Sequence, residues 1–306
     1  MSSSKVSVII PAYNHERFIG PAVESVLRQT HAELELIIID DGSTDRTAEV
    51  IRGYQDARLQ YIYQENQDAY NALNRGLSMA SGDFVAILNS DDIYTPNRLQ
   101  RLLEVQRSSG AQCLFTRVRL INDDGDLLDD PGLWWNQWYA DAVSRYVQSG
   151  DLYTAFLQRN GLVTTSNFFL TREAVRTVGN FCPLRYLHDY DYIFRVLLAF
   201  PTQVSFLHDE PLLFYRIHGS NTISEAAITG REQDKAVIRQ YLLARIPADL
   251  HSLTVAGLDR LVELEQELML EQQRRAGLVE PGIRMQAKNL LRSCAKRLYK
   301  GLRGGR

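Results

Sequence analysis

The chain has 306 residues, enough for one large α/β domain with an extension or for two modest domains. Its formal net charge of −3 and its ordinary composition give no reason to expect a nucleic-acid partner. The three cysteines are widely spaced and form neither a disulfide framework nor a metal knuckle; with no signal region and no long apolar run, a cytoplasmic location is expected.

Strand-like and helix-like segments alternate through the first third of the chain. Apolar, β-rich runs predict strands at 6–10, 34–39, 59–63 and 84–88. Helical spacing predicts helices at 18–29, 45–54, 69–80 and 96–107, the last with Thr95 as its N-cap. This alternation is typical of a mainly parallel central sheet flanked by helices.

The alternation becomes irregular after residue 113. Further strands are predicted at 114–121, 167–170, 204–207 and 212–217, and helices at 171–178 and 189–200. Beyond residue 224 the pattern is helical, at 231–245 and 257–275, and a basic segment follows from residue 283. We therefore expect an α/β domain with a helical C-terminal extension.

Four short segments rich in aspartate stand out. Two follow buried strands, Asp40-Asp41-Gly42-Ser43 and Asn89-Ser90-Asp91-Asp92; the others are His188-Asp189-Tyr190-Asp191 and, more weakly, Asn66-Gln67-Asp68. An open α/β sheet binds its ligand beyond the carboxyl ends of its strands, so these acids should converge on one cleft. Clustered carboxylates are costly without a cation or hydrogen-bond donors, which indicates a divalent metal and a phosphate-bearing ligand.

Each segment also has a structural interpretation. Asp41 is either part of simple turn chemistry or an acceptor for a nucleobase imide. Asp91 and Asp92 precede a helix start that Thr95 already supplies, so one acid suits a ribose and the other a metal. Asp189 either caps the helix that follows it or acts as a general base.

Two further groups of residues have open alternatives. His218 follows the last predicted strand and is either incidental or a ligand for a metal or phosphate oxygen. The tryptophans Trp134, Trp135 and Trp138 either pack in the core or form a platform for a sugar acceptor. The chain lacks G-x-G-x-x-G after its first strand, a P-loop and a nucleophile elbow.

Together these motifs resemble bacterial glycosyltransferase family 2. The resemblance rests on residues 6–14, 40–45, 70–76, 88–92 and 188–191, in that order, and extends from residue 5 to about residue 224. It implies a GT-A fold and an inverting transfer of a sugar from a nucleotide-sugar donor, a UDP-sugar by preference. It also implies Mn²⁺ or Mg²⁺ as cofactor and a saccharide or lipid-linked saccharide as acceptor, in the synthesis of bacterial surface polysaccharide or glycolipid.

The resemblance also implies roles for individual residues. Asp189 would be the catalytic base, and Asp92 would hold the metal, with His218 as a second candidate ligand. The implied nucleotide-sugar-binding residues are Pro11, Ala12, Tyr13, Asn14, Asp41, Asp68, Asn74 and Asp91. The catalytic domain would span 1–224, with a nucleotide-binding half (1–110) and an acceptor half (111–224), followed by the extension, 225–306.

Two other functions and the role of the extension stay open at this point. A sugar-1-phosphate nucleotidylyltransferase would have a related architecture, and a non-catalytic scaffold would keep the fold without the chemistry. Residues 283–303 have the spacing of a basic amphipathic helix that binds an anionic membrane surface or packs on protein. Leu261, Leu264 and Leu268 suggest a short coiled-coil seam and a homo-oligomer.

Overall fold

The computed structural model describes residues 4–219 and 229–275, and the basic segment 283–303 lies outside them. By its internal contacts the chain divides into two compact units, Met1–Tyr241 and Leu242–Arg306. The first unit therefore extends past the boundary expected at residue 224.

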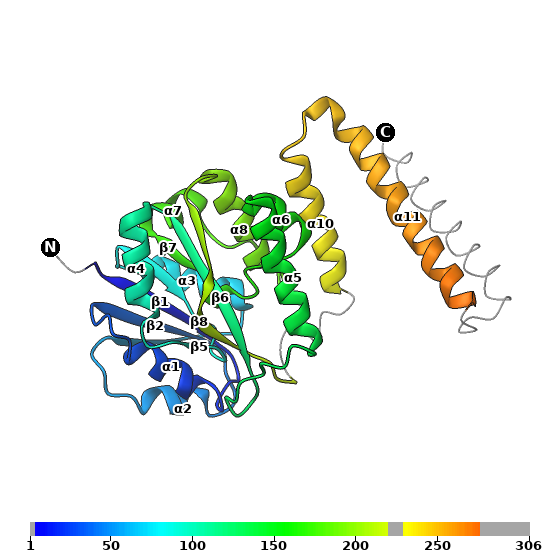
Figure 1. The fold of residues 1–306 in the computed structure, drawn as a ribbon. Helices are drawn as coiled ribbons and strands as arrows, with labels where there is room; N and C mark the ends of the chain where they lie inside the picture. Colours follow the sequence, from blue (N-terminus) through cyan, green and yellow to red (C-terminus); the bar gives the residue numbers. More distant parts are fainter. Residues whose placement is uncertain (1–3, 220–228, 276–306) are drawn as a thin grey trace, which may run out of the picture. The chain divides into compact units, whose positions relative to one another are not determined.

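The first unit is built on an eight-stranded sheet with the order β3-β2-β1-β4-β7-β6-β8-β5 (Figure 1). Its strands are β1 (Val6–Ala12), β2 (Leu34–Asp41), β3 (Leu59–Gln64), β4 (Phe84–Ile87), β5 (Ile93–Tyr94), β6 (Cys113–Ile121), β7 (Phe169–Thr171) and β8 (Val204–Arg216). The described helices of this unit are α1 (Ile19–Leu27), α2 (Thr47–Arg52), α3 (Ala69–Met79), α4 (Arg98–Ser109), α5 (Trp134–Ser149), α6 (Leu152–Gln158), α7 (Arg172–Val178), α8 (His188–Ala199) and α10 (Thr229–Leu243), with a 3₁₀ turn η1 (Thr165–Asn167).

The sheet has a parallel half and a mixed half. β1 pairs in parallel with β2 and β4, and β2 pairs in parallel with β3. β7 is antiparallel to both β4 and β6, β5 is antiparallel to β8, and β6 is parallel to β8. The α/β class expected from the sequence is confirmed, and the carboxyl ends of β1, β2 and β4 lie at one edge of the sheet.

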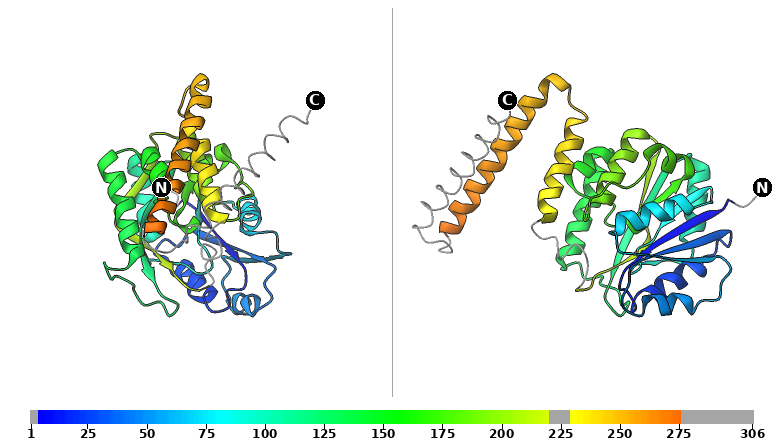
Figure 2. Two further views of the ribbon diagram at one scale, coloured as in Figure 1. Left: turned by 90° about the vertical axis from the view of Figure 1, so that its right-hand side faces the viewer. Right: turned by 180° about the vertical axis from the view of Figure 1, so that it is seen from behind.

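The parallel half is buried and closely packed. Every residue of β2 is buried, as expected for a strand covered on both faces. Helix α3 packs so closely on β1 that a Cβ added at Gly76 would lie 2.4 Å from Cγ2 of Ile9. Figure 2 shows from two further sides that α1 and α2 lie together on one face of the strands.

A buried carboxylate fixes the opposite edge of this half. Glu35 accepts hydrogen bonds from Lys5 Nζ at 2.8 Å, from Ser7 Oγ at 2.5 Å and from the backbone nitrogen of Ser81 at 2.7 Å. Burial alone would raise the pKa of Glu35, but these hydrogen bonds outweigh it and lower the pKa to about 2. The network joins the starts of β1 and β2 to the turn before β4.

The start of α4 differs from the expectation. Its N-cap is Asn97, not Thr95, and the Asn97 side chain makes no capping bond. The backbone nitrogen of Leu99 instead donates to Oε1 of Gln29 at 2.9 Å, while the hydroxyl of Thr95 is hydrogen-bonded to the Asn97 side chain and near the Leu212 carbonyl. A distant glutamine thus satisfies the free amide that a local cap would otherwise serve.

The two strands expected at 204–207 and 212–217 are one long strand, β8. Its register with β6 jumps from Thr116↔Leu207 to Arg117↔Pro211, so residues 208–210 lie outside the ladder. Arg101 of α4 holds this bulge through Glu210, with Nε and Nη2 each 2.8 Å from a carboxylate oxygen. The aromatic segment 133–139, for which the sequence predicted no element, begins helix α5.

Helix α10 is anchored to the first unit through Tyr241. The Tyr241 hydroxyl donates to Oδ1 of Asp191 at 2.6 Å, and its carbonyl accepts from the Tyr153 hydroxyl at 2.6 Å. Its ring stacks on Phe194 with centroids 4.5 Å apart. These contacts with α6 and α8 explain why the first unit continues to residue 241.

The second unit contains a 3₁₀ turn, η2 (Ala248–Leu250), and the helix α11 (His251–Arg275). Leu253, Leu261, Leu264 and Leu268 are exposed on α11. Within the described residues, no helix combines the length and apolarity needed to cross a bilayer.

Candidate active site

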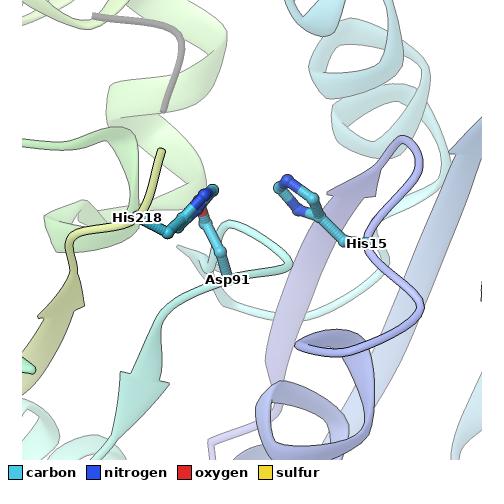
Figure 3. Close-up of side chains that lie close together, drawn as sticks. All are labelled: His15, Asp91 and His218. Atoms are coloured by element: carbon cyan, nitrogen blue, oxygen red, sulfur yellow. The ribbon is translucent and has the colours of Figure 1, made fainter. Parts of the chain in front are cut away.

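Three titratable side chains meet at the carboxyl edge of the sheet. His15 lies in the loop after β1, Asp91 in the turn after β4, and His218 just beyond β8 (Figure 3). One ligand atom from each residue lies within 4.8 Å of the others. Three residues far apart in the sequence are therefore brought together at the strand ends, and of these His15 was not among the residues singled out from the sequence.

Neighbouring contacts orient the three side chains. Nε2 of His218 lies 3.0 Å from Oδ2 of Asp91, and the two imidazole rings are edge to face with centroids 5.6 Å apart. Nδ1 of His15 lies 2.7 Å from Oγ of Ser90, the residue before Asp91. The Nε2 atom of His15 is thereby left as its ligand atom.

The electrostatics of this cluster suit a divalent cation. Burial lowers the pKa of His15, so its imidazole is neutral at pH 7, as a metal ligand must be. Burial opposes ionisation of Asp91, but the hydrogen bond from His218 and electrostatic attraction to His15 and His218 hold the pKa of Asp91 below its ordinary value. One carboxylate and two imidazoles form a mixed oxygen and nitrogen donor set, which fits Mn²⁺ better than the oxygen-preferring Mg²⁺.

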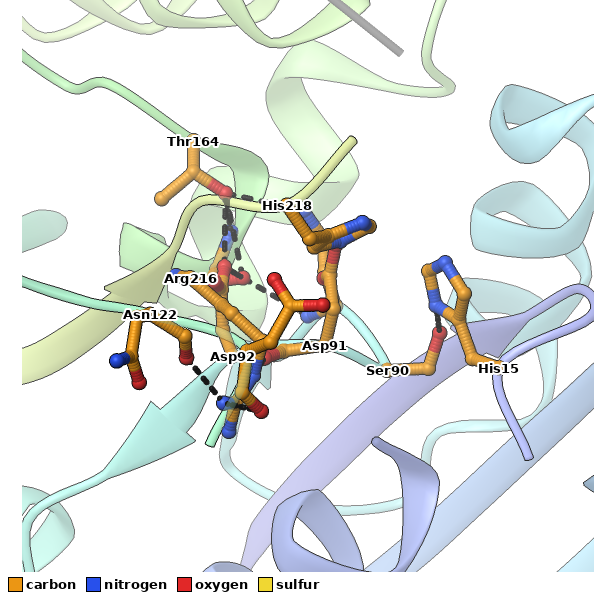
Figure 4. Close-up of polar contacts among 11 residues, drawn as sticks. His15, Ser90, Asp91, Asp92, Asn122, Thr164, Arg216 and His218 are labelled. Atoms are coloured by element: carbon orange, nitrogen blue, oxygen red, sulfur yellow. Dashed lines mark hydrogen bonds and ion pairs between the residues drawn. The ribbon is translucent and has the colours of Figure 1, made fainter. Parts of the chain in front are cut away.

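Asp92 lies behind this cluster, and its carboxylate is bound by the protein (Figure 4). Oδ1 accepts from the backbone nitrogen of Arg216 at 3.0 Å, and Oδ2 accepts from Ser166 Oγ at 2.5 Å and Thr164 Oγ1 at 3.2 Å. Burial and the charge of Asp91 raise the pKa of Asp92 well above its ordinary value. The geometry therefore favours Asp91, not the expected Asp92, as the carboxylate available to a metal.

Arg216 connects the end of β8 to the acidic turn. Its backbone binds Asp92, its Nε donates to the carbonyl of Asp91 at 2.8 Å, and its Nη1 donates to the carbonyls of Asn122 and Asp123 at 2.6 and 2.8 Å (Figure 4). This buried arginine thereby sets the position of His218, two residues later. The sequence analysis did not identify Arg216 as a site residue.

The loops after β1 and β2 form one joined structure. Oδ1 of Asn14 accepts from the Thr44 amide at 2.8 Å, and the Asn14 amide donates to Oγ of Ser43 at 3.0 Å. Asn14 adopts a positive φ of 51°, which asparagine tolerates better than most residues. Tyr13, beside it, is 48% exposed. Asn14 thus shapes the loop, and Tyr13 is the more accessible side chain.

Asp41 lies at the end of β2 with one oxygen bound by the protein. Oδ1 accepts from Gln64 Nε2 at 2.7 Å and from the Gln67 amide at 3.0 Å. Within the described part of the chain, no hydrogen-bond partner reaches Oδ2. Burial raises the pKa of Asp41, as does the nearby charge of Asp68. Pro11 and Ala12 belong to the end of β1, next to this strand.

Asp68 and Asn74 are positioned by contacts with the segment before α8. The Asn74 side chain forms two hydrogen bonds with the backbone of Phe181, donating at 3.0 Å and accepting at 2.7 Å. Oδ1 of Asp68 lies 3.4 Å from Nη1 of Arg185. Asn74 therefore holds the segment in place, while Asp68 forms an exposed ion pair.

Asp189 is buried in the first turn of α8, whose N-cap is Leu187. Burial raises the pKa of Asp189, an effect that the neighbouring His188 partly opposes. Asp191, by contrast, is held by Arg195 at 2.9 Å and by Tyr241. Asp189 is therefore not the N-cap residue, although its Oδ1 accepts from the backbone amide of Tyr190 at 2.8 Å, and Asp191 is a structural residue.

Tyr215, near the end of β8, and Trp135 of α5 form a stacked pair that we call the aromatic wall. Burial raises the pKa of the Tyr215 hydroxyl, and the charges of Asp92, Asp91 and Asp189 raise it further. Trp135 stacks on Tyr215 with ring centroids 5.8 Å apart.

The other two tryptophans, Trp134 and Trp138, also lie in the first two turns of α5. Trp134 is 67% exposed, and its ring stacks with that of Trp138 at 6.4 Å. Among the described ring contacts, Trp135 is the tryptophan that stacks on Tyr215.

Comparison with known proteins gives a consistent result. The family model described as "Glycosyl transferase family 2" matches residues 7–176. An uncharacterized glycosyltransferase of Nostoc sp. is 32% identical over 75% of this chain and 70% of its own length. The putative teichuronic acid biosynthesis glycosyltransferase TuaG of Bacillus subtilis is 40% identical over 40% of this chain and 50% of its own.

Two solved structures illustrate the similarity in fold. S. aureus TarS 1–349 in complex with UDP-GlcNAc superposes with a TM-score of 0.61 at 18% identity, covering 81% of this chain and 69% of that one. The mannosyltransferase PcManGT from Pyrobaculum calidifontis, in complex with GDP-Man and Mn²⁺, gives a TM-score of 0.60 at 18% identity, covering 99% and 83%. At this level of identity the comparison establishes the GT-A fold alone.

Proposed function

Because the chain belongs to glycosyl transferase family 2 and is a glycosyltransferase, we propose that it transfers a sugar from a UDP-sugar to an acceptor hydroxyl with inversion at the anomeric carbon. The acceptor is a saccharide or lipid-linked saccharide of the bacterial surface. Family membership argues against both alternatives, the nucleotidylyltransferase and the non-catalytic scaffold. The cluster of His15, Asp91 and His218 is the observation that carries this proposal.

The donor is held along the carboxyl ends of the parallel strands. The Oδ2 atom of Asp41 accepts a hydrogen bond from the base, and Tyr13 lies against the nucleotide. Asp91 and His218, with His15, would hold a divalent cation, which would supply positive charge to stabilise the leaving diphosphate. UDP is the preferred nucleotide because the uracil imide supplies the donor that the free oxygen of Asp41 requires.

Asp189 removes the proton from the acceptor hydroxyl. The oxygen attacks the anomeric carbon as the bond to the diphosphate oxygen breaks, and the proton passes to the Asp189 carboxylate. Its raised pKa brings it closer to the operating pH, which favours a general base. Displacement from the side opposite the diphosphate inverts the anomeric configuration. The stacked Trp135 and Tyr215 support the acceptor ring.

Nucleotide release from a panel of UDP-sugars and GDP-mannose tests the proposal. We expect release from at least one UDP-sugar with Mn²⁺, and its loss when EDTA removes the metal. NMR of the glycoside product should show the anomeric configuration opposite to that of the donor. Release that persists in EDTA would refute metal dependence, and retention of configuration would refute the role of Asp189.

A further inference from the structure

A groove outside the candidate active site lies between β6, the bulge of β8 and helix α5, three elements that are adjacent in Figure 1. Its volume of about 560 Å³ falls in the range of small-molecule sites. None of its lining residues belongs to the cluster of His15, Asp91 and His218. We call it the β6–α5 groove, and its functional lining residues are Arg117, Arg119, Asp129, Asn136, Gln137 and Tyr139.

Contacts within the protein fix the walls of the β6–α5 groove. Nδ2 of Asn136 donates to the carbonyls of Leu128 and Asp130 at 2.8 and 2.7 Å, which ties the loop after β6 to α5. Arg119 forms an ion pair with Asp129 of the same loop. On the other side, the bulge of β8 is held by Arg101. The groove is therefore preformed, which lowers the entropy lost on binding.

Two polar side chains of the groove form no hydrogen bond or ion pair within the described residues. Arg119 is paired with Asp129, and Asp209 lies 2.9 Å from Nδ1 of His208. Across the described residues, by contrast, neither the Arg117 guanidinium nor the Gln137 side-chain amide has a recorded hydrogen bond or ion pair. Arg117 is exposed at the groove. The groove lining thus balances two arginines against two aspartates, and it leaves the Arg117 guanidinium and the Gln137 amide available to bind a ligand.

The floor of the groove is apolar and adjoins the aromatic wall. Tyr139 is buried, and its hydroxyl accepts from the Val118 amide at 3.1 Å. Its ring lies 5.1 Å from that of Trp135, which in turn stacks on Tyr215. One layer of aromatic side chains therefore connects the groove to the site where the acceptor is expected.

We propose that the β6–α5 groove binds an anionic saccharide unit of the acceptor, remote from the hydroxyl that reacts. Arg117 binds its carboxylate or phosphate, since a guanidinium matches either group with two parallel hydrogen bonds. Gln137 binds ring hydroxyls, and the apolar floor packs against the sugar face. The identity of the ligand as an acceptor segment rests on the proposed function, whereas the binding site itself does not.

Ligand-observed NMR titrations test this assignment on the full chain, with the cleft saturated by UDP and Mn²⁺. The probes are methyl glucuronide for the carboxylate, glucose 6-phosphate for the phosphate, and methyl glucoside as the neutral reference. We expect at least one anionic probe to bind about tenfold more tightly than the neutral one. Arg117→Ala should remove that preference, and Gln137→Ala should weaken binding of all three probes.

Arg107→Ala is the matched control, because Arg107 is an exposed arginine on α4 that does not line the groove. It should bind the probes as the wild type does. Equal affinity for neutral and anionic probes, binding unchanged in Arg117→Ala, or no binding by any probe would overturn the proposal. UDP affinity, measured separately on the same proteins, reports on the donor site. Failure of the wild type to bind UDP would count against the proposed function and not against the groove.

Discussion

Replacing Asp92 should lower the stability of the fold, whereas replacing Asp91 should weaken metal-dependent nucleotide binding. Asp92→Ala removes the buried hydrogen bond from the Arg216 amide to a carboxylate, worth about 1.5–3 kcal/mol, and two hydroxyl hydrogen bonds worth about 1 kcal/mol each. We expect a loss of roughly 3–5 kcal/mol in unfolding free energy. The two hydroxyls keep other contacts, because Ser166 Oγ also accepts from the Asn89 amide and Thr164 Oγ1 from the Asn89 side chain. Neither hydroxyl is left unsatisfied in the variant, so each contributes the loss of one hydrogen bond and no further cost of burying an unpaired polar group.

Asp91→Asn should act on the ligand and spare the fold. An asparagine oxygen still accepts a hydrogen bond from His218, but the negative charge needed by a cation is lost. We expect at least about a tenfold loss of Mn²⁺-dependent UDP affinity, with a change in stability below about 1 kcal/mol.

Urea denaturation and calorimetric titration of UDP with and without Mn²⁺ separate the two effects. Asp92→Ala should unfold at lower urea and, at temperatures where it is folded, keep its response to Mn²⁺. The reasoning fails if Asp92→Ala retains wild-type stability but loses the response to Mn²⁺, or if Asp91→Asn retains that response.

Three further results are expected. Asp189→Asn should reduce turnover by about 10²-fold or more with little change in UDP affinity; a defect confined to donor KM would instead make Asp189 a binding residue. The pKa of Glu35 is depressed from 4.5 to about 2, so its stabilising contribution is complete above pH 4.5 and is lost as pH falls toward 2. Glu35→Gln should therefore be about 1–3 kcal/mol less stable at pH 7, and the wild type should lose this advantage in acid; parallel stability curves would contradict this. Gly76→Ala should cost about 1–3 kcal/mol in urea denaturation because its Cβ would overlap Ile9; an equal cost for Ala at Gly257, a helical glycine with nothing within 4 Å, would show that crowding is not the cause.

The parallel half of the fold was predictable because its sequence signals are local. β1, β2 and β4 contain short apolar runs and β3 has an alternating pattern, each bounded by polar turns, and the buried β2 is apolar for most of its length. The edge strand β5 has two residues, too few to show any period. The bulge that keeps β8 continuous depends on Glu210 meeting Arg101, a contact that spacing along the chain does not reveal.

The site was predictable as a region but not atom by atom. The sequence places acids after β2 and β4, and parallel topology then brings the strand ends together. It does not show which of two adjacent aspartates turns inward; that depends on Ser166, Thr164 and Arg216, which belong to distant segments. The position of His15 just after the first strand was a hint that it belongs to the site. No neighbouring residue, however, distinguished it from an ordinary loop histidine.

The anchoring of α10 bears on where this enzyme can be shortened. A chain ended at residue 224 would lose Tyr241, expose the face of Phe194 on which it stacks, and remove one hydrogen bond each from Asp191 and Tyr153. All three lie on or against α8, the helix that carries Asp189. A shortened protein that ends at residue 224 would therefore expose apolar surface on the helix that carries the proposed base and would be prone to aggregation. One that ends just after α10 would keep these contacts.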